Sequence, residues 1–170
     1  MNYIRKYASP AGMLTLASDG ESLTGLWIEG QDYFPDLDKT VNQKDDLPVF
    51  VQTIQWLNKY FEGTNPGALP PVAPEGTGFR KAVWDVLVKI PYGTLKTYGD
   101  VAREVSGNQN GKFVSPRAVG GAVGHNPISI IIPCHRVIGS NNSLTGYAGG
   151  LDLKVKLLES EKIDVSKYKR

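Results

Sequence analysis

Alternation of apolar and polar positions marks the start of the chain and predicts β-strands over residues 3–30. Residues 13–18 and 23–28 are rich in residues that favour strands, and the sequence Ser-Asp-Gly-Glu at 18–21 is typical of a turn. The polar and acidic stretch 31–47 predicts a loop. The first part of the chain is therefore expected to form a small antiparallel sheet.

Apolar positions at helical spacing follow and predict a helix over residues 48–62. Its apolar face is expected to hold Val51, Ile54, Leu57, Tyr60 and Phe61. Residues 63–78 then contain four prolines and four glycines, a composition typical of a linker or an extended crossing segment. We therefore expect two domains, a small N-terminal α/β domain at 1–77 and a second domain at 78–170.

The second half predicts helices joined by short connections. Apolar residues fall at helical spacing over 79–90, 97–106, 117–123 and 151–162. Thr77, Thr97 and Ser115 precede three of these segments and suit N-cap positions. Gly107 is expected to end the second helix, and a polar loop at 106–114 to lead into the third. Two short helices joined by a loop match a helix-turn-helix, so the predicted fold class is α+β with a winged-helix-like second domain.

Composition favours an ordinary globular protein of one domain or two small ones. The chain has 170 residues, of which 41% are hydrophobic and 21% charged. Its start lacks the apolar segment of a signal peptide, and no apolar run reaches the ~18–20 residues that span a membrane. A single cysteine excludes an internal disulfide and a Cys-rich zinc site, and it suits a reducing compartment. We therefore expect a cytoplasmic protein.

Charge is divided unevenly along the chain, although the formal net charge is only +2. Residues 1–77 carry 5 Lys/Arg and 10 Asp/Glu, whereas residues 78–170 carry 14 Lys/Arg and 7 Asp/Glu. A basic second half promotes binding to a polyanion such as nucleic acid. Surface charge also serves solubility, so charge alone leaves both interpretations open.

The lone cysteine, Cys134, stands in the sequence Pro-Cys-His-Arg-Val at 133–137. The thiolate is the reactive form, and a neighbouring base or positive charge lowers the pKa of a thiol. Residues 126–133 form a β-branched run with a proline near each end, which predicts an extended segment that carries Cys134 away from solvent. Cys134 and His135 are therefore either a nucleophile with its base or a buried structural cysteine beside a histidine.

Two adjacent glycines, Gly120 and Gly121, lie inside the predicted helix at 117–123. Each glycine inside a helix costs roughly 0.8–1.0 kcal/mol relative to alanine. Such a cost indicates that the backbone approaches something closely. Tight packing against another helix and a smooth helix face laid against DNA both remain open at this point.

Five segments in order along the chain resemble the O6-alkylguanine–DNA alkyltransferases, which transfer an alkyl group from damaged guanine to their own cysteine. The matching segments are Tyr98 and residues 117–122, 126–127, 133–137 and 147–151. The strong match covers about residues 79–162, and residues 1–77 resemble the family's variable N-terminal domain only in the order of their elements. The resemblance implies repair by direct reversal, in which each molecule irreversibly accepts one alkyl group from O6 of guanine. The O4 atom of thymine is a further candidate for the alkylated position.

The resemblance implies a role for each catalytic residue. Cys134 accepts the alkyl group as a thioether, and His135 acts as general base through a water molecule. Glu161 orients and polarises His135, although without the resemblance a surface carboxylate would be favoured there. Tyr98 donates its hydroxyl proton to the base ring as guanine leaves. A direct bond between Cys134 and His135 is not expected, because successive side chains of an extended chain point to opposite faces. Displacement at an sp³ carbon suits a thiolate and needs no metal.

The resemblance also implies how duplex DNA is bound, because the target base must be flipped out of the stack. Arg117 is expected to fill the gap, Tyr98 to help rotate the nucleotide, and Asn126 to act as a hinge. The helix with Gly120 and Gly121 is expected to pack in the minor groove. The implied DNA-binding residues are Tyr98, Arg117, Ala118, Gly120, Gly121, Ala122 and Asn126. The implied alkylguanine pocket consists of Tyr98, Tyr147, Ala148 and Gly149.

The chain departs from the family pattern in its loops and its metal ligands. The loop at 107–114 is several residues longer than usual, so Lys112 either adds a phosphate contact or alters how Arg117 is presented. Ala148 stands where some relatives have serine, which changes the polarity of the pocket. Some relatives bind a structural zinc through N-terminal Cys and His, but residues 1–77 contain neither. We therefore expect no metal and no cofactor.

Three other functions compete with alkyl transfer. A non-catalytic sensor of alkylated DNA would lack the cysteine, which is present here. A helix-turn-helix regulator would bind DNA sequence-specifically, most often as a dimer, and we find no dimerisation segment and expect a monomer. A Cys–His hydrolase would turn over an ester or amide without DNA. Double-stranded DNA that contains alkylated guanine is thus the expected partner.

Overall fold

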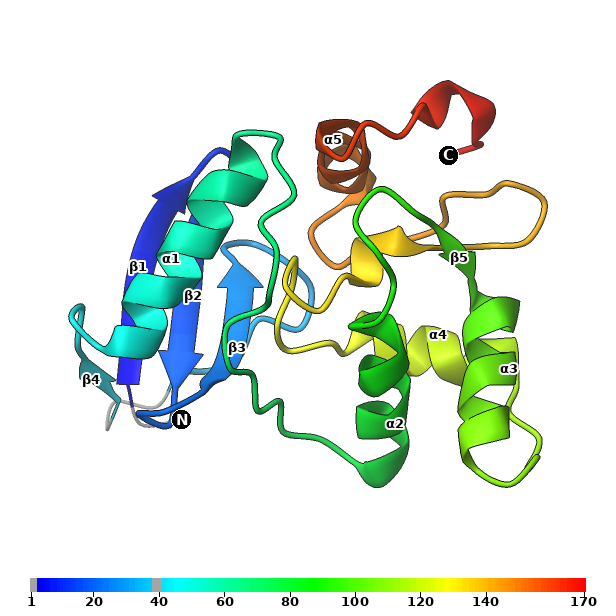
Figure 1. Cartoon of the computed structure of the whole chain (residues 1–170), viewed down its shortest axis with the longest axis horizontal. Coiled ribbons are helices and arrows are strands. Elements are labelled where there is room, and N and C mark those ends of the chain that lie inside the picture. The colour runs from blue at the N-terminus through cyan, green and yellow to red at the C-terminus, as the bar shows by residue number, and fades with distance from the viewer. Residues whose placement is uncertain (1–2, 38–40) are drawn as a thin grey trace. The chain divides into compact units, whose positions relative to one another are not determined.

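The computed structural model describes residues 3–37 and 41–170, which divide into two compact units (Figure 1). One unit runs to Glu75 and includes Pro127–Ser129, and the other comprises Gly76–Asn126 and Ile130–Arg170. The α+β class is confirmed, because the first unit contains a sheet and the second is mostly helical. The sequence gives no sign that Pro127–Ser129 joins the first unit, and the predicted domain division at 77/78 stays a prediction.

Three strands of the first unit follow the predicted hairpin pattern. β1 (Tyr3–Ser9) pairs antiparallel with β2 (Gly12–Ser18), and β2 pairs antiparallel with β3 (Leu23–Ile28). Leu14, Leu16 and Leu26 are fully buried, so this sheet supplies the core of the unit. None of the helices that the structure describes is long and apolar enough to cross a membrane.

A fourth strand lies inside the segment predicted to be a loop. β4 (Asn42–Gln43) pairs parallel with β1, and within the described residues the sheet order is β3-β2-β1-β4. Two residues cannot show an alternating pattern, so the sequence carries no signal for this strand. Residues 38–40 of the predicted loop lie outside the described residues.

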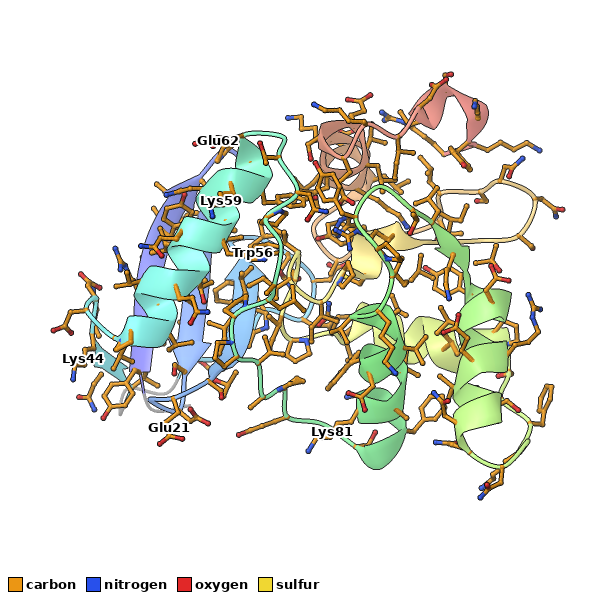
Figure 2. The ribbon with its side chains drawn as sticks, in the orientation of Figure 1. Glu21, Lys44, Trp56, Lys59, Glu62 and Lys81 are labelled. Carbon is orange, nitrogen blue, oxygen red and sulfur yellow. The ribbon has the colours of Figure 1, made fainter. Side chains whose placement is uncertain are left out.

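The first helix forms where the spacing predicts it, but its buried face is rotated. α1 (Pro48–Phe61) contacts β1 and β2, and Figure 2 shows the buried Trp56 and the exposed Lys59 on it. Val51 was expected in the core and is 42% exposed. The rings of Trp56 and Tyr60 stack with centroids 5.6 Å apart, one helical turn from each other. Burial of this aromatic pair sets the face at the expense of Val51. The buried residues of the helix are Val49, Phe50, Thr53, Trp56, Leu57 and Tyr60.

Three helices that pack on one another form the frame of the second unit. They are α2 (Gly78–Leu87), α3 (Tyr98–Asn108) and α4 (Pro116–Gly124), of which α3 and α4 form the predicted helix-turn-helix. All three predicted N-caps are confirmed, and Thr97 forms a capping box with Asp100. The prediction that Gly107 ends the second helix is wrong, because α3 continues one residue beyond it; glycine lowers helix stability without breaking the backbone hydrogen bonds.

The remaining elements surround the segment that contains the cysteine. β5 (Lys96–Thr97) pairs parallel with β6 (Val137–Ile138), and a 3₁₀ helix, η1 (Cys134–Arg136), leads directly into β6. α5 (Leu151–Ser160) follows and is shorter than predicted, because Glu161 forms its C-cap. A last 3₁₀ helix, η2 (Val165–Lys167), lies near the C-terminus.

The prediction of an extended segment at 126–133 is wrong. Most of these residues form turns, and only Ile128 pairs with a strand, through an isolated parallel bridge to Leu26. Ile130 adopts a left-handed backbone conformation with φ 71°. The isoleucines are nevertheless buried, from Ile128 and Ile130 to Ile131 and Ile132. Their β-branched side chains therefore report burial rather than strand geometry.

Trp84 connects α2 to α4 through a buried hydrogen bond in which its Nε1 donates to the carbonyl oxygen of Ala122 at 2.9 Å. We predict that Trp84→Phe lowers the free energy of unfolding by roughly 1–3 kcal/mol, because a buried carbonyl loses its donor. Chemical denaturation measures this change. Asp85→Asn, at an exposed position of the same helix, is expected to stay within about 0.5 kcal/mol of the parent. Equal stability of the two variants would contradict the role of this bond.

Candidate active site

Cys134 lies at the start of η1 and is almost completely buried, at 6% exposure. Burial raises the pKa of its thiol, whereas the side chain of Asn126 and the charge of Lys154 act in the opposite direction. The neighbouring groups thus lower the pKa as expected, but burial outweighs them and the net shift is upward. Removing water from around a thiolate outweighs the nearby positive charge. The resting thiol is therefore protonated and needs a base to react.

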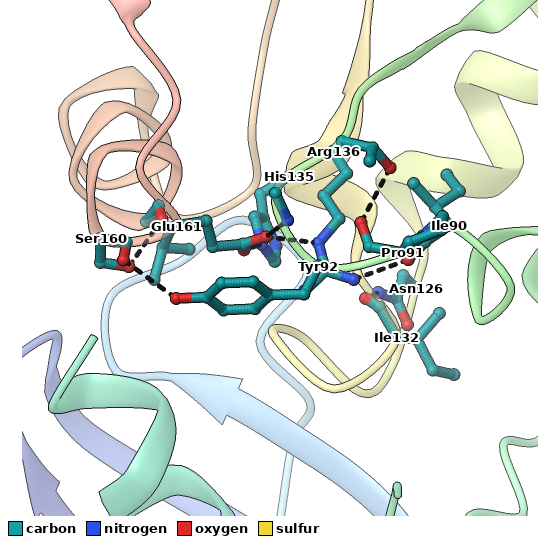
Figure 3. Close-up of polar contacts among 12 residues, drawn as sticks. Ile90, Pro91, Tyr92, Asn126, Ile132, His135, Arg136, Ser160 and Glu161 are labelled. Carbon is teal, nitrogen blue, oxygen red and sulfur yellow. Dashed lines mark hydrogen bonds and ion pairs between the residues drawn. The ribbon is translucent and has the colours of Figure 1, made fainter. Parts of the chain in front are cut away.

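His135 and Glu161 form a hydrogen-bonded pair in the interior, with the His135 Nε2 and Glu161 Oε2 atoms 2.5 Å apart. Both side chains are fully buried. Glu161 is thus part of the interior of the second unit and not a surface carboxylate of a lysine-rich helix. Figure 3 shows the carboxylate of Glu161 next to the side chains of His135 and Arg136. The 3₁₀ conformation also removes the premise that Cys134 and His135 point to opposite faces of an extended strand.

The second carboxylate oxygen of Glu161 is held by two further donors. Arg136 Nε donates to Oε1 at 2.7 Å, and the backbone N–H of Gly93 donates to the same oxygen at 2.9 Å. Arg136 Nη1 also donates to the carbonyl oxygen of Ile90 at 2.7 Å, and its guanidinium lies over the ring of Tyr92. Gly93 has φ 76°, and a Cβ there would lie 3.3 Å from the Glu161 carbonyl oxygen, so both conformation and space favour glycine.

These contacts determine which groups of the pair are charged. Burial by itself raises the pKa of Glu161, but the bonds and charges of His135, Gly93 and Arg136 outweigh it and hold the pKa at about 2. Burial lowers the pKa of His135 despite the neighbouring carboxylate. At neutral pH the site therefore contains an ionised Glu161 and a neutral His135. A neutral imidazole is the form that can accept a proton.

Lys154 is a functional candidate that the sequence pattern does not reveal. It lies on α5 with no exposed surface, and its Nζ donates to the carbonyl oxygens of Val137 at 2.7 Å and Leu144 at 2.6 Å. Burial lowers its pKa to about 8, and a thiolate at Cys134 raises it. Lys154 thus fastens the connection before α5 to β6 and places a positive charge near the thiol. Lysine is almost never fully buried, so a sequence reading places this side chain in solvent, and only the structure reveals its buried contacts.

Tyr98 and Asn126 each form a hydrogen bond close to the segment that contains Cys134. The Tyr98 hydroxyl forms a hydrogen bond with Thr145 Oγ1 at 3.1 Å, and burial raises the pKa of Tyr98. The phenol therefore keeps its proton and can donate it. Asn126 is buried and its Nδ2 donates to the carbonyl oxygen of Ile132 at 2.8 Å, which closes the turn just before the cysteine.

Tyr98 and Arg117 both line a cleft of about 560 Å³, which fits the shared role that the resemblance implies for them. It lies between the start of α3, the start of α4 and the turn after β6. Its wall includes Tyr98, Arg103, Arg117, Gly120, Gly139 and Ser140. A cleft of this size accommodates a group as large as a nucleobase.

The exposed face of α4 contains only part of the predicted DNA-binding set. Arg117, Ala118 and Gly121 are exposed, and a Cβ added at Gly121 would meet no atom of the described residues within 4 Å. Tight helix packing therefore does not explain Gly121. Gly120 faces the ring of Tyr98, 4.0 Å from the position of an added Cβ. Ala122 is only 3% exposed, so its side chain packs inside the unit, and its role in DNA binding stays a prediction.

The predicted alkylguanine pocket residues Tyr147, Ala148 and Gly149 are half-buried and lie just before α5. Gly150 follows them with φ 93°, and its N–H donates to the Tyr147 carbonyl oxygen at 2.9 Å, which forms a tight turn. The part of the chain that the structure describes contains no group of three or more His, Cys, Asp or Glu side chains that could hold a metal ion.

Comparison with known proteins identifies the family. The description "6-O-methylguanine DNA methyltransferase, DNA binding domain" matches residues 78–163, and the ribonuclease-like domain of the same protein matches residues 2–66. A methylated-DNA–protein-cysteine methyltransferase from Haemophilus influenzae is 46% identical over 162 residues, which cover 95% of this chain and 87% of that protein. One from Methanosarcina acetivorans is 42% identical over 160 residues, which cover 94% and 97%.

A solved structure agrees with these matches. The crystal structure of Mycobacterium tuberculosis OGT in complex with DNA superposes with a TM-score of 0.82 at 40% identity, covering 98% of this chain and 94% of that one. The chain therefore belongs to the methylated-DNA–protein-cysteine methyltransferase family.

The buried carboxylate makes stability depend on acid pH. Because the pKa of Glu161 falls from 4.5 to about 2 on folding, its contribution is complete above pH about 4.5 and is lost as pH falls toward 2. We predict that Glu161→Gln lowers the free energy of unfolding at pH 7 by roughly 3 kcal/mol and flattens its decline below pH 4.5. Denaturant unfolding at several pH values measures both. The control is Asp152→Asn, whose side chain is 86% exposed; a parent-like acid profile in Glu161→Gln would contradict the assignment.

Proposed function

We propose that this chain repairs DNA by direct reversal, moving an alkyl group from the O6 atom of guanine to its own Cys134. The observation that carries this proposal is the buried 2.5 Å bond between Glu161 and His135, the residue that follows the lone cysteine. A buried thiol with a raised pKa needs a base, and a neutral histidine oriented by a carboxylate supplies one. The family to which the chain belongs supports the same chemistry.

The proposed step exchanges a proton for the alkyl group. His135 takes the thiol proton of Cys134 through a water molecule, and the sulfur attacks the alkyl carbon. A sulfur–carbon bond forms while the carbon–O6 bond breaks, and its electron pair stays with guanine. Tyr98, protonated because burial raises its pKa, donates a proton to the base ring. The imidazolium of His135 then returns a proton to the Tyr98 phenolate through solvent, so that overall the thiol proton replaces the alkyl group on guanine. Since a thioether is not displaced by thiols, each molecule acts once.

Duplex DNA is the proposed partner, with the damaged base turned out of the stack. The exposed start of α4 enters the minor groove, and Arg117 occupies the gap that the base leaves. Tyr98 lines the same cleft as Arg117 and helps turn the nucleotide. Tyr147, Ala148 and Gly149 line the side of the pocket that the alkyl group enters. Asn126, through its bond to Ile132, couples the end of α4 to the cysteine segment.

Other properties complete the proposal. We propose that the protein acts as a monomer and without a cofactor. We place it in the cytoplasm, because a free thiol survives in that reducing compartment. O4-alkylthymine is a second candidate substrate. A non-catalytic damage sensor is less favoured, because it would lack the cysteine. A helix-turn-helix regulator is less favoured, because sequence-specific binding does not require a buried histidine–carboxylate pair next to a cysteine.

Transfer itself is tested by the mass of the intact protein after incubation with duplex DNA that contains one O6-methylguanine. We predict a gain of one methyl group, located on Cys134 and saturating at one per protein molecule. Cys134→Ala is expected to bind the DNA but to gain no mass. An unchanged mass of the parent protein, with the DNA still bound, would make the protein a sensor or regulator and refute the transfer.

Gly121 tests the DNA-facing surface of α4 independently of the chemistry. Gly121→Ala places a methyl group in open space and favours the helix, so we predict a free energy of unfolding unchanged or raised by up to about 1 kcal/mol. Repair of duplex DNA is nevertheless expected to slow several-fold, while reaction with free O6-methylguanine base stays unchanged. Gly78→Ala, which also faces open space at the first turn of α2, is the matched control. Unimpaired duplex repair by Gly121→Ala would remove this surface from the interface.

A further inference from the structure

We propose that Lys112 and Phe113, in the loop between α3 and α4, form an additional contact with duplex DNA beside the recognition helix. The inference rests on the proposed function and extends the DNA-binding surface beyond α4. It assigns a role to the loop at 109–115, which joins these two helices.

The loop has a hydrogen-bonded structure that projects these two residues outward. The backbone N–H groups of Gln109 and Gly111 both donate to the Ser106 carbonyl oxygen, at 3.0 and 2.9 Å. The N–H of Lys112 donates to the Gln109 carbonyl oxygen at 3.2 Å. Asn110 and Gly111 adopt left-handed conformations with φ 59° and 77°, which reverse the chain at low cost for these residue types. The position of Lys112 and Phe113 is thus set by a defined turn.

Phe113 is 84% exposed, which makes it the most exposed of the large hydrophobic side chains in the described residues. A single exposed apolar residue is ordinary on a protein surface. This one, however, borders a hollow of about 440 Å³ beside the first turn of α4. The residues that line the hollow include Phe79, Gln109, Lys112, Phe113, Ser115 and Ala118. An aromatic ring, an ammonium group and small residues therefore meet on one surface.

Duplex DNA is the occupant that this chemistry favours. Among the described residues, no acidic side chain lines the hollow, and Lys112 supplies the positive charge that a phosphate group needs. Ser115 and Ala118 are small enough to let a sugar–phosphate chain approach, and Phe113 offers an apolar surface to a deoxyribose or a groove wall. Ala118 belongs both to the hollow and to the exposed face of α4, next to Arg117. A DNA strand that runs along α4 toward the N-terminus of this helix would therefore continue onto the loop.

The test compares duplex binding with chemistry on a free base. Affinity for an undamaged duplex is measured over a range of salt concentrations for the parent, Lys112→Ala, Phe113→Ala and the double variant. We predict that the double variant binds roughly five- to thirtyfold more weakly, and that Lys112→Ala lowers the salt slope of log Kd by about 1. Reaction with free O6-methylguanine base and thermal stability are expected to match the parent. Lys112→Arg and Phe113→Tyr are expected to restore binding.

Control variants separate this inference from general effects of charge. Lys156→Ala removes an exposed lysine from α5 and is expected to leave duplex affinity at parent values. Parent-like affinity and salt slope in the double variant would overturn the inference while transfer from duplex DNA by the parent still supports the proposed function. A double variant that retains DNA affinity but loses self-association, measured by sedimentation, would assign the surface to a second copy and overturn it too. Failure of the parent to transfer any alkyl group would instead refute the proposed function.

Discussion

The buried carboxylate of Glu161 is the interaction on which the rest of the site depends. One of its oxygens bonds to His135, and the other accepts hydrogen bonds from Arg136 and Gly93. Three segments far apart in sequence, at 93, 135–136 and 161, therefore meet at one negative charge. A buried carboxylate without partners would be protonated or would destabilise the fold. Here the partners hold its pKa at about 2, and the negative charge in turn fixes the orientation of the imidazole. The same network therefore stabilises the unit and holds the neutral imidazole that the proposed mechanism uses as its base.

The electrostatics of the site favour a protected nucleophile. Burial raises the pKa of Cys134 and lowers that of His135, so both groups are neutral in the resting protein. A protonated thiol is poorly reactive toward oxidants and incidental electrophiles. This protection suits a protein that uses its cysteine once. Lys154, whose charge favours the thiolate, lowers the cost of forming the thiolate when a substrate is present. The two helices of the helix-turn-helix, α3 and α4, belong to the same unit, and both contribute residues to the cleft that Tyr98 lines.

Local signals in the sequence were sufficient for much of the frame. The caps at Thr77, Thr97 and Ser115 fixed the starts of three helices, because a capping side chain and its target amide lie within one turn of each other. Long-range packing escaped the same reasoning. The rotation of α1 depends on which apolar residues meet the sheet, and residues 126–133 are buried mostly in turns, with only an isolated bridge from Ile128 to Leu26 in place of a strand.

The same distinction between local signals and long-range packing applies to the candidate site. The motif at 133–137 contains Cys134 and His135, and the family resemblance added Glu161. Spacing alone could not show that Glu161 is buried, since its partners come from η1 and from the turn before β5. Lys154 was invisible because its acceptors are backbone carbonyl oxygens, which every sequence has. The burial of Ala122 could not be predicted either, because a run of small residues does not reveal which of them faces inward.

The protonation of the His135 ring tests the central claim most directly. If Glu161 orients the base, the imidazole is neutral at pH 7, with its proton on Nε2 facing the carboxylate and Nδ1 as the basic nitrogen. Nitrogen-15 chemical shifts of the ring, assigned by comparison with a His135→Gln variant, distinguish the forms. We expect the Nε2–H tautomer in the parent and a mixture of forms in Glu161→Gln. An imidazolium, or an Nδ1–H tautomer, in the parent protein at pH 7 would contradict the account.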